Sequence, residues 1–154
     1  MTEITVLESR NGKLSNEIRR MLNAPASPFS INCTPSPREL FDLRTELLVV
    51  APDFAPLGIF TPPRIKCRIL LIPSASDASF FDSWCFVTYG MSPKSTITMS
   101  SISGDRLVIS LQREVVTLTG VVLERQEVVT TGGASVEYRL AAAGVVLLSG
   151  LFLP

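Results

Sequence analysis

The sequence predicts an α/β fold: a Rossmann-like, three-layer domain with a mostly parallel sheet and an antiparallel β extension in its C-terminal half. Three patterns lead to this prediction. Residues 1–50 alternate strand-like and helix-like segments, which is typical of parallel sheets built with right-handed crossovers. Residues 47–51 form an unbroken apolar run, as a strand covered on both faces does. Residues 96–102 and 107–111 alternate apolar with polar side chains around a Ser103-Gly104-Asp105 turn, which indicates an antiparallel hairpin.

Length and composition predict a single globular domain over residues 1–154. A chain of 154 residues can bury a substantial core, and its 46% hydrophobic and 18% charged residues are typical of folded proteins. Fourteen basic and fourteen acidic residues leave no formal net charge. This balance removes the long-range attraction that nucleic acids and anionic membranes exert on basic proteins, so neither is expected as a partner.

Cysteine usage and the two ends of the chain favour a cytoplasmic protein. Cys33, Cys67 and Cys85 are widely spaced and odd in number, which predicts buried free thiols and argues against a disulfide framework or a zinc site. The N-terminus lacks the features of a signal peptide. Residues 140–154 are uncharged, but this run is shorter than the ~20 residues of a membrane span, so we expect a buried helix starting near Ser135.

The first third of the chain contains two predicted strand–helix units. Residues 4–7 are short and apolar, as in a strand, and Leu14, Ile18 and Leu22 then recur at helical spacing. A second strand is expected at residues 29–33.

The second unit is predicted from a helix-start signal and the apolar run that follows. Ser36, Pro37 and Glu39 are typical of a helix N-terminus, and the helix should end near Thr45, before the strand at residues 47–51. The proline-rich segment 53–64 is then either a lid over the carboxyl ends of the strands or a plain connection.

The rest of the chain is predicted to be mainly β. Strands are expected at residues 65–72 and 85–89, separated by a short helix within residues 77–84 that directs Phe80, Phe81 and Trp84 toward the sheet. After the hairpin, residues 115–129 continue the β-rich region and are apolar enough to predict an edge that pairs with a second copy or a partner protein. The Ser135 helix closes the chain.

Few side chains suggest catalysis. The chain contains no histidine, which excludes Ser-His-Asp and Cys-His arrangements and histidine-ligated metals. Asp77 and Asp82 are interpreted as solvated surface carboxylates. Ser100 and Ser101 have no identifiable base nearby, so neither is expected to act as a nucleophile. We therefore predict no catalytic residue and no metal site.

One turn has the position of a phosphate-binding loop. Asn11, Gly12 and Lys13 lie between the first predicted strand and helix, where such loops present a lysine and backbone N–H groups. The GxxxxGK[ST] pattern is degenerate here: Leu14 takes the hydroxyl position, Ser15 comes one residue late, and the first glycine is missing. Two interpretations remain: phosphate binding by Asn11, Gly12, Lys13 and Ser15, or an Asn-Gly turn required only by the backbone.

Several segments in the same order resemble the central domain of Mur ligases. The first, ITVLESRNGKLSNEIRRML, is similar to the strand, TNGK-containing ATP loop and helix that begin that domain. Residues 69–74 with Asp77 are similar to the family's strand with an acidic turn. Residues 86–90 with 100–102 are similar to its strand that ends in tyrosine-glycine before a peripheral β region, and residues 134–142 are similar to a late helix.

The resemblance implies a reduced Mur-ligase-like domain, linked by analogy to bacterial cell-wall or sporulation metabolism. The family's magnesium ligands and active-site histidine have no counterpart here, and its flanking domains are absent from this sequence. We therefore expect a non-catalytic binding, regulatory or scaffold protein, with ATP or another nucleotide as the candidate cofactor. Two alternatives remain: an ATP-dependent ligase or nucleotide hydrolase component that needs a partner chain, and an unrelated Rossmann-like module for a small ligand.

Overall fold

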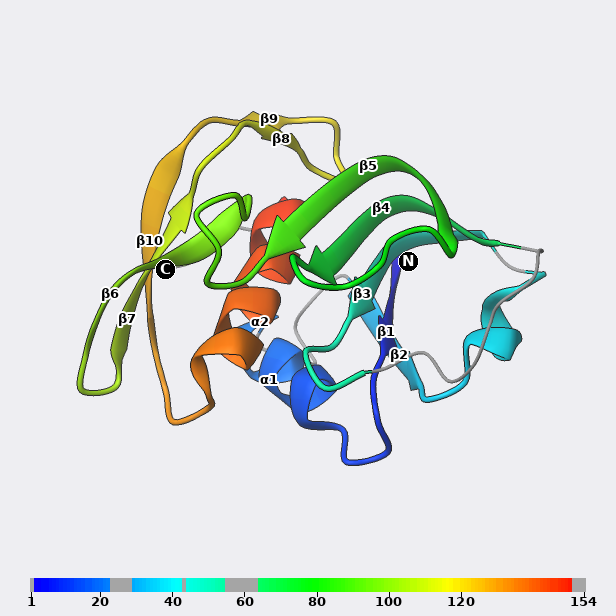
Figure 1. Ribbon diagram of the computed structural model, residues 1–154, viewed down its shortest axis with the longest axis horizontal. Helices are drawn as coiled ribbons and strands as arrows, with labels where there is room; N and C mark the ends of the chain where they lie inside the picture. Colours follow the sequence, from blue (N-terminus) through cyan, green and yellow to red (C-terminus); the bar gives the residue numbers. More distant parts are fainter. Residues whose placement is uncertain (1, 23–28, 43, 55–63, 151–154) are drawn as a thin grey trace.

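An eight-stranded mixed sheet organises the computed structural model, which describes residues 2–22, 29–42, 44–54 and 64–150 (Figure 1). The strands and helices, in chain order, are β1 (Thr2–Leu7), α1 (Lys13–Leu22), β2 (Phe29–Thr34), the 3-10 helix η1 (Pro37–Leu40), β3 (Arg44–Val50), β4 (Ile65–Pro73), β5 (Phe81–Tyr89), β6 (Ile97–Ser103), β7 (Arg106–Leu111), β8 (Val115–Val116), β9 (Val122–Leu123), β10 (Gln126–Thr131) and α2 (Val136–Ser149). The predicted α/β class is confirmed.

The strand order is β10-β7-β6-β5-β4-β3-β1-β2. Strands β1 to β6 run parallel to one another, and β7, antiparallel to β6, and β10, antiparallel to β7, add the antiparallel extension in the C-terminal half. The chain leaves β1 for β2 on one side and returns to β3 on the other. The topological switch point, where open α/β sheets bind ligands, therefore lies between β1 and β3.

Both α-helices pack against the same face of the sheet, side by side (Figure 1). In α1, Leu14, Ile18 and Leu22 are buried, as their spacing predicts. Helix α2 is buried from Arg139 to its end and confirms the predicted C-terminal helix. A Cβ on Gly144 would come within 2.9 Å of a methyl group of Leu71, so glycine allows α2 to approach the sheet closely.

A buried arginine anchors the start of α2 to the antiparallel extension. Arg139 is 2% exposed, and its Nη2 donates hydrogen bonds to the carbonyl oxygens of Asp105 (2.5 Å) and Thr130 (2.9 Å). These bonds offset part of the cost of burying the guanidinium charge. They tie the helix to the β6–β7 turn and to β10.

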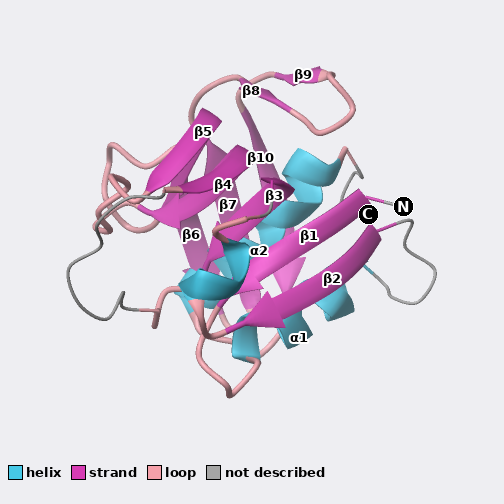
Figure 2. Ribbon diagram, turned by 90° about the vertical axis from the view of Figure 1, so that its right-hand side faces the viewer, coloured by secondary structure: helices cyan, strands magenta, loops and turns pink. Residues whose placement is uncertain are grey.

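The opposite face has a thinner cover. A second apolar cluster there joins Leu7, Val50 and Ile72 with Leu40 of η1, and Phe80 packs against it from the β4–β5 connection. The small β8–β9 hairpin lies apart from the main sheet, at the top of Figure 2. Among the described residues, the third layer therefore consists of η1 and connecting segments.

Two predicted helices are corrected by the structure. No helix forms within residues 77–84: residues 74–80 are an irregular connection, and Phe81 already pairs with Ile65 as β5 begins. The aromatic residues read as helical belong to this strand and its approach, and Trp84 is 79% exposed beneath the guanidinium of Arg44. The helix predicted from Ser36 is only the short 3-10 helix η1, and the residues expected to end it lie in β3, where Thr45 pairs with Cys67.

Other predictions have mixed outcomes. All three cysteines are free, but Cys33 is exposed on β2, so the expectation of buried thiols was wrong there. The candidate lid falls mostly on residues 55–63, which lie outside the described residues. Among those that are described, no helix has both the length and the apolar character needed to cross a membrane.

Candidate functional site

The predicted phosphate loop lies where the sequence placed it, between β1 and α1. Gly12 has a φ of 67°, the left-handed conformation that favours glycine. The Lys13 N–H donates to Asn11 Oδ1 (3.0 Å), and Ser15 Oγ donates to the Gly12 carbonyl (3.1 Å). The four predicted residues are therefore close together, with Asn11 and Lys13 exposed and Ser15 buried.

A carboxylate from the same chain already occupies the N-terminus of α1. Glu8, directly after β1, is 2% exposed and accepts hydrogen bonds from the backbone N–H groups of Leu14 (3.0 Å) and Ser15 (3.3 Å to each oxygen). In a phosphate-binding loop these backbone groups would face the phosphate. Sequence reasoning missed Glu8, although an acidic residue just before a turn and a helix is a recognisable signal.

A second carboxylate bridges the switch point. Asp53, just after β3, accepts hydrogen bonds from Ser9 Oγ (2.8 Å) and Asn11 Nδ2 (3.3 Å). Partial burial alone would raise the pKa of Asp53, but these bonds and one from Tyr138 outweigh it and hold that pKa below its usual value. The amide side chain of Asn11 therefore uses both its polar atoms within the protein: Oδ1 accepts from Lys13 N–H, and Nδ2 donates to Asp53.

Two tyrosines lie beside these carboxylates. Burial, followed by the neighbouring charge of Asp53, raises the pKa of Tyr138 to about 12. Burial also raises the pKa of Tyr89, with a smaller contribution from the charge of Glu137, and its hydroxyl donates to the Val50 carbonyl at 2.5 Å. Both phenols therefore stay protonated at neutral pH and act as hydrogen-bond donors.

A cleft of about 560 Å³ opens at the carboxyl ends of β4 and β5, next to the start of α2. No lysine or arginine is found among the described residues that line it, and its one charged side chain is that of Glu137. The lining residues are Pro52, Pro73, Ser74, Ala75, Ser76, Tyr89, Gly90, Met91, Ser92 and Glu137.

Hydrogen bonds hold the segment 93–95, which directly follows the cleft-lining residues Gly90, Met91 and Ser92. The side chain of Gln112 donates to the carbonyls of Pro93 (3.2 Å) and Ser95 (2.7 Å), and Arg113 donates to that of Lys94 (2.9 Å). Ser95 is 1% exposed and is hydrogen-bonded to Ser74. These serines have structural partners.

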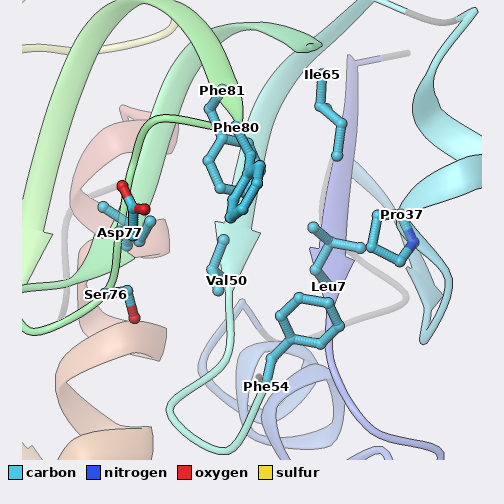
Figure 3. A pocket seen from close by; sticks show the side chains of 10 residues that line it. Leu7, Pro37, Val50, Phe54, Ile65, Ser76, Asp77, Phe80 and Phe81 are labelled. Carbon is cyan, nitrogen blue, oxygen red and sulfur yellow. The ribbon is translucent and has the colours of Figure 1, made fainter. Parts of the chain in front are cut away.

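A smaller apolar pocket of about 70 Å³ adjoins the cleft on the thinly covered face (Figure 3). Figure 3 shows Ser76 and Asp77 on one side of it and Leu7 and Pro37 on the other. Ser76 lines both cavities. The complete lining is Leu7, Pro37, Val50, Phe54, Ile65, Ile72, Ser76, Asp77, Phe80 and Phe81.

Comparisons with known proteins add no relative. No known protein family, no curated protein and no solved structure matches the chain.

The residues singled out as possible catalytic groups can also be placed in the structure. The described part of the chain contains no group of three or more Cys, Asp or Glu side chains placed to hold a metal ion. Ser100 and Ser101 are exposed on β6, and Asp77 and Asp82 are exposed on the β4–β5 connection and on β5. The surface positions predicted for both aspartates are confirmed.

Proposed function

We propose that this protein is a non-catalytic binding domain, Mur-ligase-like in design, with a regulatory or scaffold role and a ligand site at the carboxyl edge of the sheet. One observation carries the proposal: the buried Glu8 carboxylate takes the backbone N–H groups that a nucleotide phosphate would need. A phosphate entering there would have to displace a hydrogen-bonded anion and would be repelled by it.

The strand order supports the Mur-ligase-like design. That resemblance requires a parallel core with an antiparallel extension after the fifth strand, and β6, β7 and β10 have this position. Strand order alone also fits an unrelated Rossmann-like module, because one fold serves many functions.

The charge around the cleft supports binding without phosphoryl transfer. Glu8, Asp53 and Glu137 place negative charge at this edge, whereas phosphoryl transfer uses cations to stabilise the phosphate oxygens. The cleft is therefore better suited to a neutral or positively charged ligand.

An ATP-dependent ligase or hydrolase component, completed by a partner chain, is the second candidate. The observation in its favour is the position of Lys13, exposed at the first residue of α1 after a glycine with positive φ. A partner chain would then have to supply the missing metal ligands.

Calorimetric titration with ATP and magnesium separates the two candidates. We expect no saturable binding to the unmodified protein and no ATP turnover. Saturable binding that is lost in Lys13→Ala, but kept in the control Lys66→Ala on β4, would favour the nucleotide site. Turnover would eliminate the non-catalytic proposal.

We also propose a protein partner or second copy at the β10 edge. β10 lies at one end of the sheet, and its Val129 is 41% exposed. Such an edge pairs readily with another strand. Light scattering coupled to size-exclusion chromatography should show a dimer that Val129→Lys dissociates, and a monomer at all concentrations would contradict self-pairing.

A further inference from the structure

The polar cleft and the apolar pocket meet at one shared residue and differ in the chemistry of their linings. Both border the segment after β4, and Ser76 belongs to each. A ligand lying across Ser76 would therefore have one part among hydroxyl and carboxylate groups and another among aromatic and aliphatic side chains.

The pocket selects an apolar group of limited size. Leu7, Val50 and Phe81 in its lining are nearly inaccessible to solvent, and Phe54 and Phe80 add aromatic side chains to the lining. Its volume of about 70 Å³ is roughly half that of the ~150 Å³ engineered cavity that takes benzene, so it suits a branched aliphatic group of roughly three or four carbons.

The charged side chains that line the pocket and the cleft favour a cationic ligand. Asp77 lies on the polar side of the pocket in Figure 3, and the described residues lining either cavity include no lysine or arginine. The backbone N–H of Ser79 donates to Asp77 Oδ1 (2.9 Å) and lowers the pKa of Asp77, so this carboxylate is ionised at neutral pH. Glu137 adds a second negative charge in the cleft.

We propose that the two cavities form one site for a small aliphatic amine. Its ammonium group lies at Asp77 and Ser76, its branched aliphatic group fills the pocket among Phe54, Phe80 and Phe81, and any further polar part extends into the cleft. This assignment rests on the proposed binding function and specifies the chemical class of its ligand.

Titration with isobutylamine, followed by NMR of the methyl groups of Leu7, Val50 and Ile72, tests the proposal. A ligand of so few atoms binds weakly, so the titration should extend to about 50 mM. We expect saturable shifts of these methyl signals, with affinity rising about fourfold per carbon from ethylamine to isobutylamine. Unchanged methyl signals would overturn the proposal.

Ligand charge and one variant test the ammonium position. Isovalerate, which has a similar aliphatic group and a negative charge, should bind more weakly than isobutylamine. Asp77→Asn should reduce amine affinity about threefold to fivefold, as for a partly exposed ion pair, and should leave isobutanol binding unchanged. Asp105→Asn, at the distant β6–β7 turn, is the matched control and should have no effect.

These outcomes are separable from those of the nucleotide test. Equal binding of isovalerate and isobutylamine, or no effect of Asp77→Asn, would overturn the amine assignment and leave the non-catalytic proposal standing. ATP turnover would overturn the non-catalytic proposal whatever the amine titration shows.

Discussion

Removal of the Glu8 carboxylate should both weaken the fold and create an anion site. In Glu8→Ala the N–H groups of Leu14 and Ser15 lose their buried acceptor. A hydrogen bond to a charged group contributes about 1.5–3 kcal/mol, and an acid at a helix N-terminus adds about 0.3–1 kcal/mol. Because the 3.3 Å contacts of Ser15 are longer than the 3.0 Å contact of Leu14, we expect a total loss of about 2–4 kcal/mol.

Urea unfolding measures this loss. Glu3→Ala is the matched control, since Glu3 lies in β1, the strand that leads to Glu8, but is exposed and should change stability by less than about 0.5 kcal/mol. Inorganic phosphate should then stabilise Glu8→Ala more than the unmodified protein, because an anion that binds the vacated N–H groups favours the folded state.

Two results would refute this reasoning. If Glu8→Ala is no less stable than Glu3→Ala, the carboxylate does not hold the start of α1. If phosphate stabilises both proteins equally, the α1 N-terminus is not a latent anion site, and the proposed reason for the absence of nucleotide binding fails.

Further predictions concern packing, thiols and the buried arginine. Gly144→Ala should lower the free energy of unfolding by about 1–3 kcal/mol through overpacking against the sheet, whereas Gly133→Ala, with no atom within 4 Å of the added Cβ, should not; urea unfolding compares them. In the folded protein at neutral pH, a thiol reagent should label exposed Cys33 quickly and buried Cys67 only on unfolding. Burial raises the pKa of Cys67 from 9.0 to about 11, so its contribution to stability is fully present below pH 9.0 and lost as pH rises through about 11. If the difference in the free energy of unfolding between Cys67→Val and the unmodified protein stays constant from pH 9.0 to about 11, this reasoning is contradicted. Arg139→Met should destabilise by about 2–4 kcal/mol because it removes the hydrogen bonds to the buried Thr130 carbonyl and the partly buried Asp105 carbonyl, and an unchanged unfolding midpoint would contradict that role.

Local patterns predicted much of the fold because the signal and the structure lie within a few residues of each other. The strand, turn and helix from β1 to α1 follow from apolar spacing and an Asn-Gly turn, and α2 follows from a long apolar run. The segment around Phe80, Phe81 and Trp84 was misread because a short aromatic run fits a helix or a strand equally well. Only its pairing with β4 decides between them.

The sequence by itself determined the α/β class, the parallel core with its antiparallel extension, and the location of the Asn11-Gly12-Lys13 turn, since these depend on local periodicity and backbone preference. The tertiary structure decided what that turn can do. Glu8 reaches the N–H groups of α1 only because the chain reverses at Gly12, and Asp53 reaches Asn11 only because β3 lies beside β1. The cleft and the apolar pocket likewise form from strands far apart in the chain, so no local pattern could reveal them.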